Sequence, residues 1–195
     1  MGKNPSHFSS CGDDCPVESV SWHDAVTFCN KLSERDGLRA AYRIHGEKVT
    51  WDRSANGYRL PTEAEWECAC RAGTETAFSS GGISETGCDD RNLDRIGWYC
   101  GNASKKTHGV ARKESNTWGP HDMHGNVWEW CWDWRGDYPS RSVTDPAGPD
   151  RGSDRVHRGG SWRGGARVCR SAYRFGLVPG IRSRLLGLRL ARSAE

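Results

Sequence analysis

Residues 118–134 read WGPHDMHGNVWEWCWDW, a tryptophan-rich stretch broken by glycine, proline and aspartate. Alternate residues of an extended strand point to the same side, so the tryptophans at every second position from 128 to 134 share one face. Large aromatic residues on one strand face favour core packing over an exposed platform that stacks sugars or bases. We therefore expect these four tryptophans, together with Trp118, to lie in the core of a β-rich region.

Two helices are predicted upstream of this stretch. Ser21 and Thr62 are suitable N-caps, and Asp24 and Glu65 follow them at the spacing of a capping box. Apolar residues recur at helical period behind the first cap, and glycines at positions 37 and 73 end the two segments. No helical period is visible after Gly73, where short apolar runs alternate with turn residues. The sequence therefore predicts an α+β fold with two helices, short strands and long loops.

The composition is that of one domain, residues 1–195, with 24 Gly, 10 Trp and a net charge of +3. This small net charge supports no nucleic-acid or membrane partner, and no apolar run is long enough to span a bilayer. Neither an export signal nor a lipobox is present, so we expect a cytoplasmic location. For the same reason we expect the nine cysteines to be reduced. The histidines and the cysteine pairs have no zinc-ligand spacing.

Several segments resemble the formylglycine-generating-enzyme, or sulfatase-modifying-factor, family. They are MGKNPSHF at the start, CPVESVSWHDA, GYRLPTEAEWECACRAGT, the tryptophan-rich stretch, RVHRGGSWRGGARVCRSAYR and GLRLAR. The resemblance covers nearly the whole chain in family order, and it implies a C-type-lectin-like α+β fold. The family's first strand, near the C-terminal strand, has no counterpart here. Either the fold has lost this strand, or something else, such as a partner or a second chain, covers the exposed edge, since unpaired strand edges invite pairing.

Active family members carry two cysteines after the RGGSW motif, and the resemblance implies that this pair binds copper and oxidises a substrate cysteine. Here the second position is Cys169, but the first is Gly164. Glycine supplies no thiolate, so copper is an unexpected cofactor and no catalytic residue is assigned. Cys169 is either a remnant of the active site or, as we favour, a structural residue bonded to or packed against Cys131.

Residues 155–192 also resemble the variable region of proteins that are diversified by retroelements, which use this branch of the fold. In such regions adenines of template Asn codons are randomised between fixed residues. The fixed frame here comprises Arg155, Val156, Arg158, Gly159, Gly160, Ser161, Trp162, Ala166, Arg167, Cys169, Arg170, Ser171, Ala172, Arg174, Pro179, Arg182, Leu186 and Gly187. The fourteen positions between them, which we name the slots, are His157, Arg163, Gly164, Gly165, Val168, Tyr173, Phe175, Gly176, Leu177, Val178, Ile181, Ser183, Arg184 and Leu185.

The residue types in the slots agree with this interpretation. Randomising the adenines of an AAC codon cannot produce Lys, Glu, Gln, Met or Trp, and none of these five occupies a slot. Together these types make up roughly a fifth of average composition, so their chance absence from every slot has a probability of about one in twenty. The alternative is an ordinary arginine-rich segment.

The slots have the chemistry of a binding surface. Tyr173 and Phe175 would be rigid aromatic anchors, and Arg163 and Arg184 would offer paired donors. Exposed aliphatic side chains among the other slots would form the kind of apolar patch that marks a recognition site. We expect a ligand-binding protein whose partner is a protein. The alternatives are a formylglycine-generating-type oxidase acting through Cys169, and a structural module whose tail docks a neighbouring domain.

A calcium site is implied by the family resemblance at residues 122–129. Asp122 and Glu129 would supply carboxylate oxygens, and Gly125 and Val127 would supply backbone carbonyls, which are the hard ligands that calcium prefers. The alternative is that Glu129 pairs with an arginine beneath the tryptophans.

Overall fold

The computed structural model describes residues 2–193. Two helices lie where their caps predict them, α1 at Trp22–Arg35 and α2 at Glu63–Arg71. The Ser21 hydroxyl accepts from the Asp24 backbone N–H and the Asp24 carboxylate accepts from the Ser21 backbone N–H, which is the expected capping box. Thr62 and Glu65 form the same arrangement at α2. Both predicted helix starts are confirmed.

The prediction of only two helices is wrong, because the described residues contain a third. Helix α3, Arg91–Ile96, is capped by Asp90, whose carboxylate accepts from the backbone N–H groups of Asn92 and Leu93. Six residues make fewer than two turns, which is too short for an apolar period to be visible in the sequence. Two short 3-10 turns, η1 at Ser9–Cys11 and η2 at Ala166–Val168, complete the helical structure of these residues.

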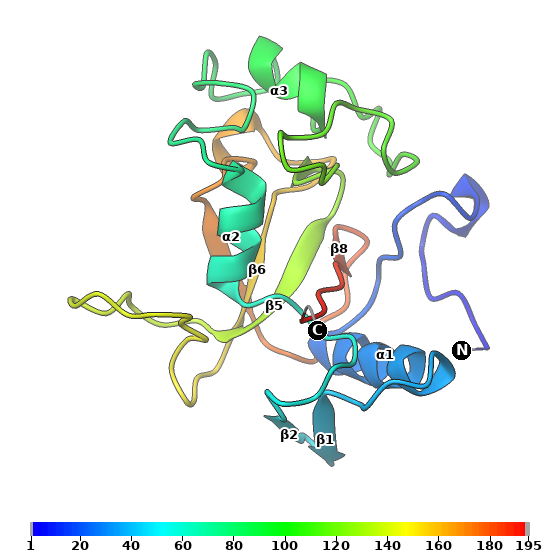
Figure 1. The fold of residues 1–195 in the computed structure, drawn as a ribbon. Coiled ribbons are helices and arrows are strands. Elements are labelled where there is room, and N and C mark those ends of the chain that lie inside the picture. Colours follow the sequence, from blue (N-terminus) through cyan, green and yellow to red (C-terminus); the bar gives the residue numbers. More distant parts are fainter. Residues whose placement is uncertain (1, 194–195) are drawn as a thin grey trace.

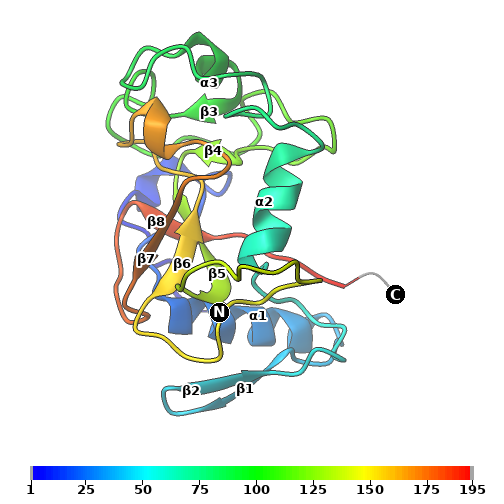
Figure 2. The same cartoon turned by 90° about the vertical axis from the view of Figure 1, so that its left-hand side faces the viewer.

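Four of the described strands form the main sheet in the order β7-β6-β5-β8. They are β5 (Trp128–Trp134), β6 (Arg155–Arg158), β7 (Arg174–Leu177) and β8 (Leu186–Leu188). Strand β6 is antiparallel to both β5 and β7, and β8 runs parallel to β5. Strands β1 (Tyr42–His45) and β2 (Lys48–Trp51) form a hairpin, while β3 (Gly97–Trp98) and β4 (His124–Gly125) make a short parallel pair. Figures 1 and 2 show the main sheet between α2 on one side and α1 below.

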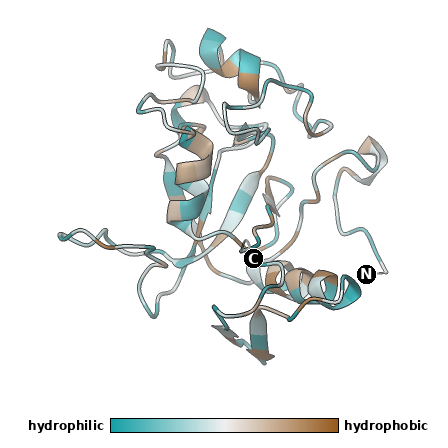
Figure 3. Cartoon of the chain, in the orientation of Figure 1, coloured by the Kyte–Doolittle hydropathy of each residue, from teal (hydrophilic) through white to brown (hydrophobic). Residues whose placement is uncertain are grey.

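Both faces of β5 are covered. Trp130 packs in a cluster with Trp22 of α1 and the β1–β2 hairpin, whereas Cys131 packs with Trp66 of α2. Apolar and polar residues accordingly alternate around α1 in Figure 3. A third cluster at the far end joins α3 to Cys169.

The predicted core role of the tryptophans is confirmed only in part. Trp130 is fully buried, and its indole N–H donates to the Val20 carbonyl. Trp128, Trp132 and Trp134 are half-buried. Trp118 is 59% exposed, so its predicted burial is wrong. It lies in the loop before β4, outside the strand whose alternation supported the prediction.

Four cysteines are paired, contrary to the expectation of reduced thiols: Cys11 with Cys15, and Cys88 with Cys100. The other five thiols are free within the described chain. Cys131 and Cys169 belong to different core clusters, so the expected contact between them is also wrong.

The outer side of β8 meets the N-terminal segment at one point. Glu18 forms an isolated antiparallel bridge with Gly187, and the Ser19 N–H donates to the Ser183 carbonyl. Between residues 2 and 21 the structure has no further strand. In the described residues no helix is long and apolar enough to cross a membrane.

Candidate ligand-binding surface

A depression of about 290 Å³ lies beside strands β5, β6 and β7 and the segment that leads into β8. Its described lining residues are Trp128, His157, Tyr173, Phe175, Leu177, Ser183, Leu185 and Leu186. Six of these eight are slots, and Trp128 and Leu186 are the exceptions. Positions predicted from sequence to vary therefore converge on one concave surface.

Strand alternation separates the slots from the frame. His157 on β6 is paired with Phe175 on β7, and both side chains line the depression together with Leu177. The frame residues Arg158 and Arg174 are the chain neighbours of His157 and Phe175. Their side chains point to the opposite side of the sheet, where both form ion pairs with Glu63 of α2. Neighbouring side chains along one strand thus either line the depression or bind the scaffold.

The floor of the depression is aromatic and uncharged. The His157 ring lies edge-on to Trp128 and Phe175, with centroids 4.9 and 5.7 Å away, and Tyr173 lies 6.0 Å from Trp128. Burial lowers the pKa of His157 to about 4, so its imidazole is neutral near pH 7. Its Nδ1 is buried and has no hydrogen-bond partner among the described residues.

Exposed apolar slots continue the surface beyond β7. Phe175, Val178 and Ile181 expose 49%, 54% and 43% of their surface. The Ile181 N–H donates to the Val178 carbonyl, which closes a turn. Pro179, a frame residue within this turn, accepts a hydrogen bond from the Trp22 N–H of α1. The turn is therefore anchored while its apolar side chains face solvent.

Arg163 and Arg184 are exposed slots beside Trp162 and do not line the depression. The Trp162 indole N–H donates to the Arg184 carbonyl at 3.1 Å, and the Arg184 guanidinium lies 5.5 Å from the indole ring. Trp162 itself is buried and holds the backbone of this arginine slot in place.

The remaining four slots, Gly164, Gly165, Val168 and Gly176, also do not line the depression. The Gly164 carbonyl accepts from the Cys100 N–H, and a Cβ at Gly165 would lie 3.1 Å from two backbone oxygens of the same loop. Val168 packs with the α3 cluster. Gly176 is buried, and a Cβ added to it would lie 2.5 Å from Cδ of Arg135. These four positions are placed against the scaffold, where a larger side chain would require it to shift.

Cys169 is fully buried, and burial raises the pKa of its thiol to about 12. Its backbone carbonyl lies 2.8 Å from Nδ1 of His124. Gly164, at the position of the family's first cysteine, offers no thiol beside it. The geometry at Cys169 is that of a packed core thiol.

Glu129 is fully engaged by protein groups. Its carboxylate accepts two hydrogen bonds from Arg189, both 2.9 Å, and one from the Trp66 indole N–H at 2.6 Å. This is the arginine pairing that the sequence offered as the alternative to calcium.

Asp122, the second carboxylate of the predicted calcium site, accepts from the Ala111 N–H through one oxygen. Its other oxygen is buried and unpartnered among the described residues. Gly125 is in β4, and Val127 is buried beside β5. No group of three or more His, Cys, Asp or Glu side chains in residues 2–193 is placed to hold a metal. Glu129 is thus paired with Arg189, and calcium binding by this set of residues stays a prediction.

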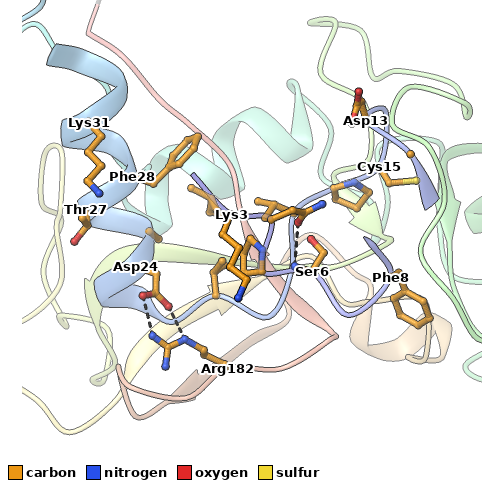
Figure 4. Close-up of a pocket in the computed structure, with 18 residues that line it drawn as sticks. Lys3, Ser6, Phe8, Asp13, Cys15, Asp24, Thr27, Phe28, Lys31 and Arg182 are labelled. Carbon is orange, nitrogen blue, oxygen red and sulfur yellow. Dashed lines mark hydrogen bonds and ion pairs between the residues drawn. The ribbon is translucent and has the colours of Figure 1, made fainter. Parts of the chain in front are cut away.

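A cavity of about 320 Å³ lies beside Asp122, Val127 and Glu129, and two larger ones lie elsewhere. One, of about 600 Å³, separates the N-terminal segment from α1, and Figure 4 shows Lys3, Phe28 and Lys31 around it beside the Asp24–Arg182 ion pair. The other, of about 780 Å³, lies between α2 and the loop after β5. No slot lines either cavity in the described structure. The depression is therefore smaller than these two cavities, but slots line the depression and neither of the two.

Residues 1–194 match the sulfatase-modifying factor enzyme 1-like domain, and the chain belongs to this family. The chain is 34% identical to a chaperone protein LppX of Paenibacillus barcinonensis, over 83% of this chain and 63% of that protein. It is 33% identical to a formylglycine-generating enzyme of Mus musculus, over 81% of this chain and 37% of that protein. The chain thus spans less than two thirds of these relatives.

Among solved structures, the fold is similar to variable protein 1 of Treponema denticola, with 38% identity and a TM-score of 0.89. That likeness covers 98% of this chain and 78% of the other. PvdO from Pseudomonas aeruginosa is also similar, with 26% identity, a TM-score of 0.74, and coverage of 94% and 64%. The α+β, C-type-lectin-like fold of the formylglycine-generating type and the resemblance to a variable protein are both confirmed.

Proposed function

We propose that this protein binds ligands through a retroelement-diversified surface on a C-type-lectin-like scaffold. One observation carries the proposal: six of the eight residues lining the depression are slots chosen from the sequence alone. The similarity to a variable protein supports it. An unrelated protein is the expected kind of ligand, because rigid aromatic side chains in a partly exposed apolar surface are typical of protein recognition.

The frame residues and the slots of the C-terminal region make different contacts, which supports the same proposal. The frame side chains of Arg158, Trp162, Cys169 and Arg174 point into hydrogen bonds or core contacts. The slots of the depression instead line a partly exposed surface, where His157 and Tyr173 pack beside Trp128. A rigid scaffold that carries a replaceable surface is the arrangement used by loop-based binders.

The alternative of a formylglycine-generating-type oxidase has less support. Cys169 is a single buried thiol with a raised pKa, whereas the chemistry needs a pair of accessible thiolates. Incubation with copper(I) and a cysteine-containing sulfatase peptide tests this reading directly. Aldehyde product formed by this chain, and lost in Cys169→Ser, would replace the binding proposal by the enzymatic one.

A pair of matched libraries tests the binding proposal. The first randomises the six slots of the depression with codons that end in cytosine. The second applies the same codons to six frame positions: Arg155, Arg158, Ser161, Trp162, Cys169 and Arg174. Displayed proteins are scored for protease resistance and selected against lysozyme as an unrelated bait.

We expect most members of the slot library to remain folded and to yield lysozyme binders, because five of the six side chains are at least partly exposed and only His157 is buried. We expect the frame library to be largely unfolded. Equal loss of folding in both libraries would favour the structural-module alternative, in which the tail docks a neighbouring domain. A folded slot library without binders would contradict the recognition role.

A further inference from the structure

The depression is too small and too apolar for a large polar ligand. Its volume of about 290 Å³ lies just below the roughly 300–1,000 Å³ of typical small-molecule sites. Three leucines and the rings of Trp128 and Phe175 dominate the lining, and the neutral His157 adds no charge. Its polar groups are the Tyr173 and Ser183 hydroxyls and the imidazole of His157, so no charged side chain lines the depression to bind a phosphate. An inserted apolar side chain fits both the size and the chemistry.

The surroundings of the depression are positively charged. Residues 155–192 contain ten arginines and neither Asp nor Glu. Four of these arginines, at 158, 174, 182 and 189, form ion pairs with carboxylates of the scaffold. Arg163 and Arg184 are exposed and form no ion pair within residues 2–193. The backbone of Arg184 lies between two lining residues, Ser183 and Leu185, and its guanidinium lies 5.5 Å from the ring of Trp162.

We infer that the ligand of this surface is a protein segment that inserts one apolar side chain, flanked by carboxylates, into the depression. The inference rests on the proposed function and specifies its partner. The apolar side chain is buried against Trp128 and Leu186, while the flanking carboxylates meet Arg184, the exposed arginine whose two chain neighbours line the depression. Charge complementarity of this kind selects among partners that share the same apolar anchor.

Synthetic peptides test the inference with the intact protein. Three acetylated, amidated peptides carry a central residue flanked by two charged residues on each side: Asp-Asp-Phe-Asp-Asp, Lys-Lys-Phe-Lys-Lys and Asp-Asp-Ser-Asp-Asp. Each is titrated into the protein while the indole N–H resonances are followed by NMR. Vesicles of anionic phosphatidylglycerol are titrated in parallel, because an apolar and cationic surface could also meet a lipid headgroup.

We expect the acidic Phe peptide to bind about tenfold more tightly than either other peptide, because each comparison removes the charge match or the buried ring. Leu177→Asp should abolish the perturbation of the Trp128 resonance, and Arg184→Ser should reduce the preference for acid over lysine. The exposed Leu190→Ser, outside the depression, is the control variant. Thermal unfolding verifies that all three variants fold.

Several outcomes overturn the inference. They are equal or tighter binding of the lysine peptide, equal binding of the serine peptide, vesicle binding without peptide binding, or no binding by any probe. The proposed function is judged separately by the slot library. Lysozyme binders from that library combined with a negative peptide result would retain the binding role and reject the acidic, apolar partner.

Discussion

The guanidinium of Arg174 makes two hydrogen bonds to the carboxylate of Glu63, 2.7 Å from Nε and 2.6 Å from Nη2. This pair ties β7, which carries Phe175 and Leu177, to the first turn of α2. Arg158 of β6 lies 3.1 Å from the same carboxylate and also binds Glu67. One acidic side chain therefore holds both strands whose opposite faces form the depression.

Glu63→Ala should destabilise the protein by about 3 kcal/mol, because it leaves the buried Arg158 and the mostly buried Arg174 short of a partner. Urea unfolding measures the change. Glu34→Ala, on the exposed side of α1, is the matched control and should shift the free energy of unfolding by under about 0.5 kcal/mol. Equal effects of the two substitutions would mean that Glu63 does not hold the strands.

The Cys88–Cys100 disulfide should contribute about 3 kcal/mol, because it closes the loop that contains α3. This loop supports the tail, since the Gly164 carbonyl accepts from the Cys100 N–H. The double substitution Cys88→Ser, Cys100→Ser should lower stability by this amount, whereas Cys68→Ser, at an exposed free thiol, should not. Alkylation of all nine cysteines in the denatured, unreduced protein would contradict both pairings.

Asp133 should make stability fall as the pH rises from about 4 to about 7. Burial raises its pKa from 3.8 to about 7, so the unfolded chain releases this proton across an interval in which the folded chain retains it. Above that interval Asp133→Asn should be more stable relative to the parent than at pH 4, by on the order of 2–4 kcal/mol.

The measurement for Asp133 is urea unfolding of parent and variant from pH 4 to pH 8, with the difference between them plotted. Taking the difference removes the opposite trend from buried His124 and His157. Their pKa values are lowered to about 4, so their contribution to stability rises with pH from about 4 to about 6.5. A flat difference curve would show that the Asp133 carboxyl is not shifted by burial.

The Glu129–Arg189 ion pair predicts that calcium leaves the melting temperature unchanged, because the carboxylate already accepts hydrogen bonds from Arg189 and Trp66. Arg189→Ala should lower stability by about 3 kcal/mol, since it leaves a buried carboxylate without its counter-charge. Melting curves with calcium and with a chelator are the measurement. A rise in melting temperature with calcium, lost in Asp122→Asn, would instead establish the metal site that the family resemblance implies.

Local signals predicted the helix starts because a capping box is complete within four residues. Ser21 with Asp24 and Thr62 with Glu65 needed no tertiary information. Helix α3 has a cap, Asp90, but it is too short to show a period. The disulfide partners Cys88 and Cys100 are brought together by the loop around that helix, which the sequence did not reveal.

Sequence identified most of the candidate surface but not Trp128 and Leu186. Strand alternation explains both results: slots such as His157 and Phe175 share the outer face, whereas Gly176 between two pocket residues is turned inward. Trp128 was assigned to the core with its neighbours. Its half-buried ring lines the depression because the side chains of His157 and Tyr173 lie on the same side of the sheet and pack beside it.

The DNA surrounding the gene tests the central claim most directly. Sequencing several kilobases on either side should reveal a near-copy of the segment that encodes residues 155–192, with adenines at the codons for the slots, beside a reverse-transcriptase gene. Independent isolates should then differ at the slots and agree at frame positions such as Arg158 and Arg174. A locus without the near-copy and the reverse transcriptase, and with substitutions spread evenly over slots and frame, would contradict the diversified surface.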